Sequence, residues 1–415
     1  MNKSFLSNDI VRNSLWMLLL QTFNMIIPLL TIPYVTRILG PEGYGQFSIA
    51  LTWILYFQVI VEYGFELTGA RAVASNNDKN AIENKISGIL TARLYLLLFS
   101  FVAMVIVWWL SGLPLYTLIC MLLLFTMVVG TTLSLTWVFQ GMQKLQFITI
   151  INVIARTISV ILIFLFVKHP EHIYRYCLFY AVTFLISGLF GCYVCNYKLN
   201  LKFHIAKFSH AVQELKFGWY LFISAAMICI FSNIGITFLT YSVTEGEIGA
   251  YSAIHKISYI MNILFVAVSK SIYPYISKSF SISENEGLKK IRQILKPVMI
   301  FFLLLGVILV LFQNLIVSLV FGNEYVAYSY LILPFVLQII FAVANNFIGI
   351  QSLVANGHQK EYSMAITLGM LAIVTFNFLL INMYGISGAA YASVLAEAFL
   401  TLILLFFYYK IYKKK

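Results

Sequence analysis

Long apolar stretches fill most of this sequence, and shorter polar segments separate them. A helix needs about 20 apolar residues to cross the hydrocarbon core of a bilayer. Stretches of this kind occupy 14–36, 45–66, 86–110, 114–138, 147–167, 177–196, 217–241, 249–274, 297–320, 328–350, 362–383 and 386–409. Only 10% of the residues are charged, against about 25% in soluble domains. The sequence therefore predicts an all-α polytopic membrane protein of about twelve transmembrane helices.

The basic residues are distributed unevenly between the two sides of these spans. Most of the 27 Lys and Arg residues lie at the termini or in the polar segments 67–85, 197–216 and 275–296. Cytoplasmic loops of membrane proteins are rich in Lys and Arg, so we expect both termini in the cytoplasm. The net charge of +12 is then a topology signal, and no nucleic-acid partner is expected. The first stretch is too long for a cleaved secretory signal, so we expect it to remain as the first span.

Two short patterns recur at matching places in the two halves of the sequence. A Gly-x-aromatic-Ser pattern opens the second span at 45–48 and the eighth at 249–252. A Gly-x-Gln-Lys pattern follows the fourth span at 141–144 and the tenth at 357–360. An even number of spans in each copy keeps both copies in the same orientation. We expect an N-lobe at 1–197, a cytoplasmic linker at 198–216 and a C-lobe at 217–415.

Several ionisable side chains fall inside the predicted spans, where a charge costs about 2.5–3.5 kcal/mol on insertion scales. They are Glu62, Glu66, Arg93, Arg156, His255, Lys256, Lys270 and Glu397. Such residues usually face a cavity or a charged partner. These eight positions are therefore the first candidates for a functional site.

The basic members of this set differ in depth. Arg156 lies near the middle of its span, too deep for its charge to reach the interface easily, so we expect it to face a cavity. Lys256 lies about two turns from the outer end of its span and Arg93 about two turns from the cytoplasm, and both are candidates for the same cavity. Lys270 either extends its charged end to the interface or shares a cationic face with Lys256.

The acidic members and the histidine leave alternatives open. Glu62 and Glu66 are one turn apart and either pair with Arg71 or Arg93 or serve an ion-coupled step. Glu397 is equally compatible with a structural hydrogen bond and with exchange of a proton, and His255 could also exchange one. We expect no metal ion and no cofactor, and leave open coupling to H⁺ or Na⁺.

Four of the charged side chains in the spans are basic and three are acidic. A cavity of this sign favours an anionic substrate, and arginine suits phosphate because its guanidinium is always charged and can bind two oxygens. Amides within the spans, such as Asn24 and Asn345, either contact sugars or bond neighbouring helices.

An ordered set of motifs then points to a known family. Residues 31–45 read Thr-Ile-Pro-Tyr-Val-Thr-Arg-Ile-Leu-Gly-Pro-Glu-Gly-Tyr-Gly. Further landmarks lie at 61–65, 272–274, 321–325 and 384–390. The chain resembles, over nearly its whole length, bacterial polysaccharide flippases of the O-antigen (Wzx) type, in the multidrug, oligosaccharidyl-lipid and polysaccharide exporter (MOP) superfamily.

The resemblance implies two six-helix lobes around a central cavity, as in the MATE-like fold, and location in the bacterial inner membrane. It implies an undecaprenyl-diphosphate-linked oligosaccharide as substrate, flipped from the cytoplasmic to the periplasmic leaflet for O-antigen or other surface polysaccharide. It also allows for partners among other polysaccharide assembly proteins. The expected cavity cations are Arg156 and Lys256, with Arg93, Lys270 and Arg37 in support. The resemblance also implies that members of the superfamily that flip lipid II carry arginines in the first span. The first span here has no charge between Arg12 and Arg37, which argues against a peptidoglycan precursor as the substrate.

Other functions remain as alternatives. A cation-coupled small-molecule exporter of the same superfamily would be expected to carry a carboxylate in the first span, and 14–36 has none. A membrane O-antigen polymerase or ligase needs a large outside loop, whereas the basic one here runs only from Lys168 to Arg175. We therefore expect a transporter and not an enzyme.

Overall fold

The computed structural model describes residues 3–76 and 78–412, and within these residues the chain is helical with no β-strand. The lysines at 413–415, which belong to the predicted cytoplasmic C-terminus, lie outside the described residues. Ten helical stretches in the described part are long and apolar enough to cross a membrane. The chain forms two compact units, one made of 1–39 and 46–232 and the other of 40–45 and 233–415.

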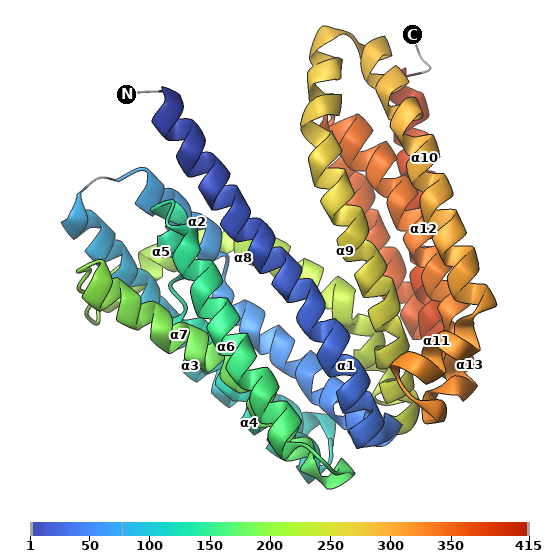
Figure 1. Ribbon diagram of the computed structural model, residues 1–415, viewed down its shortest axis with the longest axis horizontal. Coiled ribbons are helices and arrows are strands. Elements are labelled where there is room, and N and C mark those ends of the chain that lie inside the picture. The colour runs from blue at the N-terminus through green and yellow to red at the C-terminus, as the bar shows by residue number, and fades with distance from the viewer. Residues whose placement is uncertain (1–2, 77, 413–415) are drawn as a thin grey trace. The chain divides into compact units, whose positions relative to one another are not determined.

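Two of the ten stretches each contain two spans. Helix α1 (Lys3–Glu62) is interrupted at Gly40, with φ 65° and ψ 179°, and α13 (Gln359–Tyr412) at Gly385, with φ 54° and ψ −131°. Glycine adopts positive φ without the strain that a side chain would cause. Between its two spans α1 turns and runs back in a new direction (Figure 1). Ten stretches with two such turns give the twelve spans that the apolar pattern predicted.

The first unit contains the helices from α1 to α7 and most of α8. After α1 come α2 (Phe65–Ala74), α3 (Lys79–Ser111), α4 (Leu115–Leu133), α5 (Thr136–Gly141), α6 (Leu145–Phe166), α7 (Ile173–Tyr193) and α8 (Phe208–Leu239), the last of which belongs to this unit as far as Ser232. A 3-10 turn lies at Pro170–His172 and a π-helical turn at Val194–Lys198. The hydrophobic core of the first unit is built around the fully buried Trp137, Phe139 and Phe65.

Helices α4 and α7 approach each other at glycines. A Cβ atom on Gly130 would lie 2.3 Å from the carbonyl carbon of Phe184, and one on Gly188 would lie 2.5 Å from the carbonyl oxygen of Gly130. Small residues allow this backbone contact between membrane helices. The contact brings the polar side chains at the end of α4 beside those on α7.

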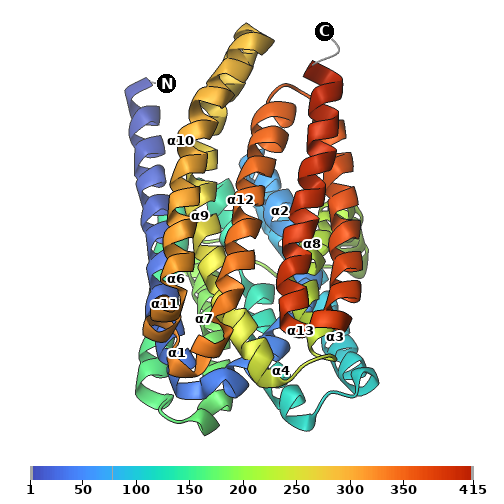
Figure 2. The same ribbon diagram turned by 90° about the vertical axis from the view of Figure 1, so that its right-hand side faces the viewer.

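The second unit contains α9 (Glu245–Ile282), α10 (Glu284–Leu311), α11 (Gln313–Val320), α12 (Ile332–Ile348) and α13, with a 3-10 helix at Asn323–Leu331 and a π-helical turn at Gly349–Val354. Figure 2 faces this unit, and α10, α12 and α13 run side by side there. The segment 40–45 packs on α9. A Cβ atom on Gly45 would lie 1.8 Å from the carbonyl oxygen of Glu245, and one on Gly249 would lie 1.9 Å from that of Pro41. The glycines that align in the sequence pattern therefore pack against each other.

Two of the three long polar segments, 67–85 and 275–296, are mainly helical. In the first, α2 runs to Ala74 and α3 begins at Lys79. Helices α9 and α10 continue through 275–296 with only Ser283 between them, and the Ser283 hydroxyl accepts the backbone N–H of Glu286 at 3.1 Å. This N-cap starts α10. Hydropathy marks where a helix leaves the lipid, and it does not mark where the helix ends.

The predicted linker, 198–216, lies wholly in the first unit, and the division between the units falls within α8 instead. Its extended part is fastened along α3. The backbone N–H groups of Lys202, His204 and Ala206 donate to the side chains of Glu83, Ser87 and Thr91, at 2.8, 3.1 and 2.8 Å respectively. Two extended residues span nearly the same length as one helical turn, so every second N–H meets the next turn of α3.

Candidate functional site

A cavity of about 490 Å³ lies within the first unit. Most of its lining residues are polar, which is unusual inside so apolar a protein. The polar ones are Asn24, Gln58, Glu62, Glu66, Thr131, Ser134, Thr136, Gln140, Gln143, Asn152, Arg156, Thr183 and Ser187. They come from α1, α2, α4, α5, α6 and α7 and from the turns on either side of α5. The cavity is therefore assembled by the fold from distant parts of the sequence.

The carboxylates of Glu62 and Glu66 reach the cavity because the helix is interrupted between them. Tyr63 and Gly64 have positive φ values of 48° and 74°, which end α1 at Glu62 and begin α2 at Phe65. Glu62 is then the last residue of one helix, and Glu66 is in the first turn of the next. The amide of Gln58 donates to Glu62 at 2.8 Å and to the Thr131 hydroxyl at 3.3 Å. Glu62 is thus held by hydrogen bonds while Glu66 remains exposed.

Arg156 is the only cationic side chain among the lining residues. It lies on α6 one turn after Asn152, so both side chains are on the same face of that helix. Within residues 3–76 and 78–412, Arg156 has no ion pair within 4.0 Å. The Asn24 side-chain oxygen is also buried and accepts no hydrogen bond from the described residues. The cavity therefore offers a cation without an ion pair together with unused hydrogen-bonding capacity.

Arg93, a predicted cavity cation, is behind the cavity wall. Its side chain is 1% exposed and does not line the cavity. The guanidinium donates to the carbonyl oxygens of Thr131 at 3.2 Å and Ser134 at 2.6 Å, where α4 ends, and it lies 5.8 Å from the ring centre of Phe65. The last carbonyls of a helix lack helical partners, and Arg93 supplies donors for them. Its observed contacts hold in place the segment whose side chains line the cavity.

The ion pairs considered for the two glutamates are not formed. Neither Glu62 nor Glu66 lies within 4.0 Å of a cationic group of Arg71 or Arg93 among the described residues. Both carboxylates line the same cavity as Arg156. The structure therefore brings together three of the candidate residues and places Arg93 directly behind them.

The other candidates lie outside this cavity. Arg37 is exposed on α1 and Lys270 is exposed on α9. Lys256 is partly buried on α9, with its ammonium 5.9 Å from the ring centre of Tyr259. Apart from Arg37, these residues belong to the second unit.

His255 and Glu397, the remaining candidates of the second unit, both have close neighbours. The ring of His255 stacks on Tyr251, with ring centres 6.0 Å apart, and lies 4.8 Å from the ring of Phe335. The Glu397 carboxylate accepts a hydrogen bond from the Asn345 amide at 2.7 Å. Asn345 in turn accepts one from Thr401, also at 2.7 Å. The structural hydrogen bond considered for Glu397 is therefore present.

Several lining residues were not among the candidates from the sequence. Gln140 and Gln143 lie at and after the end of α5, close to the repeated Gly-x-Gln-Lys pattern. Thr183 and Ser187 are one turn apart on α7. The available signal was their spacing, since polar residues four apart share a helix face, but hydroxyls and amides are too common in membrane helices to single out from spacing alone.

The helix arrangement matches solved structures of transporters. The chain superimposes on the lipid II flippase MurJ in an inward closed conformation with a TM-score of 0.77, at 15% identity, covering 95% of this chain and 87% of that one. It matches an inward-facing MATE family multidrug resistance transporter of the MOP superfamily with a TM-score of 0.73, at 12% identity and 97% coverage of both chains. These matches establish the fold.

Sequence relatives point the same way. A protein of Escherichia coli (strain K12) that carries the name O-antigen transporter is 25% identical over 95% of this chain and 96% of its own length. The capsular polysaccharide biosynthesis protein CapF of Staphylococcus aureus is 22% identical over 96% of this chain and 99% of its own. Residues 10–280 match the polysaccharide biosynthesis protein family.

The ten long apolar stretches and the helix arrangement define a polytopic α-helical membrane protein with the fold of the MOP superfamily. Within that class, the chain belongs to the polysaccharide biosynthesis protein family. The resemblance drawn from its motifs is thereby confirmed.

Proposed function

We propose that this protein flips a polyprenyl-diphosphate-linked oligosaccharide from the cytoplasmic to the periplasmic leaflet by alternating access. The family and the names of its relatives support a role with lipid-linked glycans. The observation that carries the proposal is the cavity in which Arg156 has no ion-pair partner while polar groups surround it.

The chemistry of this cavity suits the head of such a lipid. A diphosphate leaves water only if cations and donors replace its hydration, and an arginine fork binds two phosphate oxygens at once. The amides of Gln140, Gln143 and Asn152 can donate to and accept from sugar hydroxyls. A volume of about 490 Å³ is in the range of small-ligand sites. It suits the diphosphate and the sugar next to it, with the prenyl tail left in lipid.

Lys256, Lys270 and Arg37, which do not line this cavity, are proposed as further cations that contact the substrate during transport. Both termini are proposed to be cytoplasmic and the membrane to be the bacterial inner membrane, in keeping with the distribution of basic residues. Coupling to H⁺ or Na⁺ through Glu62, Glu66, His255 or Glu397 completes the proposal. It needs no cofactor. Other polysaccharide assembly proteins are its expected partners.

One observation favours a second candidate. Glu62 and Glu66 line the cavity without an ion-pair partner among the described residues, and two carboxylates suit a cationic substrate. A cation-coupled small-molecule exporter with the same fold would use them in that way. In that case Arg156 would oppose binding, so the two proposals make opposite predictions for its removal.

The test is the Arg156→Gln variant in proteoliposomes that contain a defined polyprenyl-diphosphate glycan. Removing one member of a desolvated charge pair costs about 2–5 kcal/mol, so we expect flipping to fall by about thirtyfold or more. Arg156→Lys should retain part of the activity, because lysine keeps the positive charge but cannot bind two phosphate oxygens at once as the guanidinium does.

Arg175→Gln is the matched control, because Arg175 is exposed on α7 and outside the cavity. It should flip the glycan lipid at the rate of the unaltered protein. Normal flipping by Arg156→Gln, or a gain in export of a cationic dye by that variant, would exclude the flippase mechanism and favour the exporter.

A further inference from the structure

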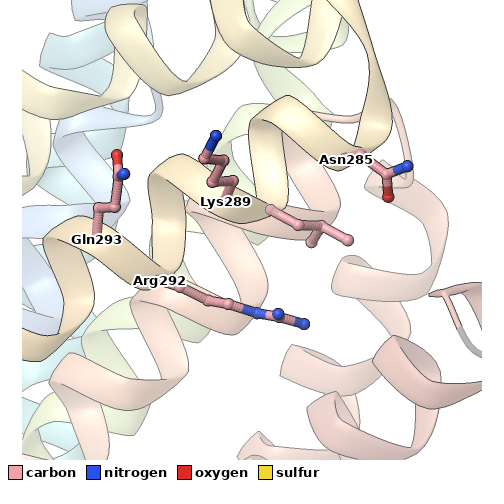
Figure 3. A pocket seen from close by; sticks show the side chains of 5 residues that line it. Asn285, Lys289, Arg292 and Gln293 are labelled. Atoms are coloured by element: carbon pink, nitrogen blue, oxygen red, sulfur yellow. The ribbon is translucent and has the colours of Figure 1, made fainter.

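The first turns of α10 carry a basic face that no part of the proposed transport cycle uses. Lys289, Arg292 and Gln293 line a shallow pocket of about 310 Å³ with Asn285 and Leu288 (Figure 3). No Asp or Glu is among the five lining residues. Lys289 lies 4.0 Å from Glu286, an exposed pair with weak coupling. Arg292 has no ion pair among the residues described by the structure.

The same face of the helix changes character after Lys296. Positions 289, 292, 293 and 296 follow the spacing of one helical face. That face continues through Ile300, Leu303 and Val307, whose side chains are 46%, 42% and 54% exposed although they are apolar. Exposed apolar side chains on a span of mean hydropathy 2.8 belong in lipid. The basic residues therefore adjoin the lipid-facing surface without a change of face.

The distances fit the headgroup layer of a bilayer. Seven residues separate Lys289 from Lys296, which is about 10 Å along a helix axis. Each headgroup layer is roughly 5–8 Å deep. If the hydrocarbon begins at Pro297, where the apolar face starts, Lys296 is at its edge and Arg292, about 6 Å further along the axis, is in the headgroup layer. Lys289 lies just above it, where its ammonium can still reach down.

We propose that this face of α10 is a binding site for the headgroups of anionic phospholipids in the membrane around the protein. Such a lipid has a phosphate next to its acyl chains. The face of α10 has basic side chains next to exposed apolar ones, so it matches both parts of the lipid. The pocket is shallow and its basic side chains are exposed, which suits an abundant lipid bound weakly and exchanged often. A scarce substrate would need a more enclosed site.

The experiment uses the full-length protein and a photoreactive phosphatidylglycerol whose label is in the headgroup. After irradiation, crosslinked peptides are located by mass spectrometry. We expect labelling within 285–296, and we expect competition by phosphatidylglycerol but not by phosphatidylcholine. Each basic residue near an anionic surface contributes about fivefold in affinity. The triple variant K289Q/R292Q/K296Q should therefore lose labelling there by tenfold or more.

Two controls separate this result from a general loss of charge or fold. K289R/R292K/K296R retains the charges and should retain labelling. K202Q/K207Q removes exposed charges from the extended segment of the first unit and should leave labelling of 285–296 unchanged. Thermal unfolding should show that the three variants are folded.

The other outcomes would overturn the proposal. Equal labelling with phosphatidylcholine would show that the basic face has no role in recognition. Labelling that only a polyprenyl diphosphate competes away would assign the site to the substrate instead. Labelling that free inorganic phosphate removes at equal concentration would show a free-anion site with no contribution from lipid.

Discussion

Polar side chains are used differently in the two units of this protein. In the first, Arg156, Asn24 and Glu66 line a cavity and have little or no bonding to the protein around them. In the second, Glu397, Asn345 and their neighbours bond to one another.

A second group in that unit shows the same behaviour. The Gln351 amide donates to the Ser269 hydroxyl at 3.0 Å, and that hydroxyl donates to Asn346 at 2.8 Å. A polar group inside a membrane protein either stabilises helix packing or is available to a ligand. Buried polar atoms without a partner among the described residues occur in both units. What distinguishes the first unit is that Asn24 and Arg156 line a cavity in which a substrate has room to bind.

The largest expected effect comes from filling that cavity. Thr183 lines it from α7, and Thr183→Trp would occupy space that the substrate head needs. We expect flipping in proteoliposomes to fall to the level of protein-free vesicles. Leu189→Trp on the same helix is the control, because Leu189 is 53% exposed and its replacement should be tolerated. If Thr183→Trp transports normally while remaining folded, the cavity is not the route of the substrate.

The next effect is on stability, and it contrasts two asparagines. Asn345→Ala removes the donor to the Glu397 carboxylate and the acceptor of the Thr401 hydroxyl. A buried polar group left without a partner costs about 1–3 kcal/mol, so we expect a clear fall in the unfolding midpoint in detergent.

Asn152→Ala is the matched variant for this contrast. Among the described residues, the Asn152 amide donates only within its own helix, to the Ile148 carbonyl at 2.8 Å, and its side chain lines the cavity. Its loss should change stability by less than about 1 kcal/mol while lowering flipping. If Asn345→Ala and Asn152→Ala lowered the unfolding midpoint equally, the distinction between the hydrogen-bonded side chains around Asn345 and the side chains that line the cavity would be wrong.

The fold could be predicted from the sequence because a membrane span leaves a local signal. Twenty apolar residues in succession are visible without knowledge of any neighbour. Interruptions inside apolar stretches are not visible in this way. The fourth span was predicted to run to 138, yet α4 ends at Leu133 and α5 begins at Thr136. Residues 130–137 carry no charge, and hydroxyl side chains such as those of Thr131, Ser134 and Thr136 are common in membrane helices, so hydropathy does not mark this break.

That break explains why the site was only partly predictable. Arg156, Glu62 and Glu66 were identified because charges in spans are costly, and they do line one cavity. Arg93 was identified for the same reason, but its partners are the carbonyl oxygens of Thr131 and Ser134, which are available only because α4 ends early. The direction of a charged side chain depends on where neighbouring helices end and pack. The residues around the charge in the sequence do not show this.

The smallest effect is the most specific to the contrast between the two units. The side-chain oxygen of Asn24 is buried and unbonded within the described residues, so Asn24→Leu removes an unmet hydrogen bond instead of breaking one. Replacing such a group by an apolar one of similar shape is nearly neutral or stabilising. We therefore expect the unfolding midpoint to stay the same or to rise by the equivalent of less than about 1 kcal/mol, while flipping falls severalfold. Asn152→Leu, which loses a formed bond, should not raise the midpoint. A gain in stability at the cost of transport is typical of residues retained for function, whereas a loss of stability as large as that of Asn345→Ala would mean that Asn24 supports the fold.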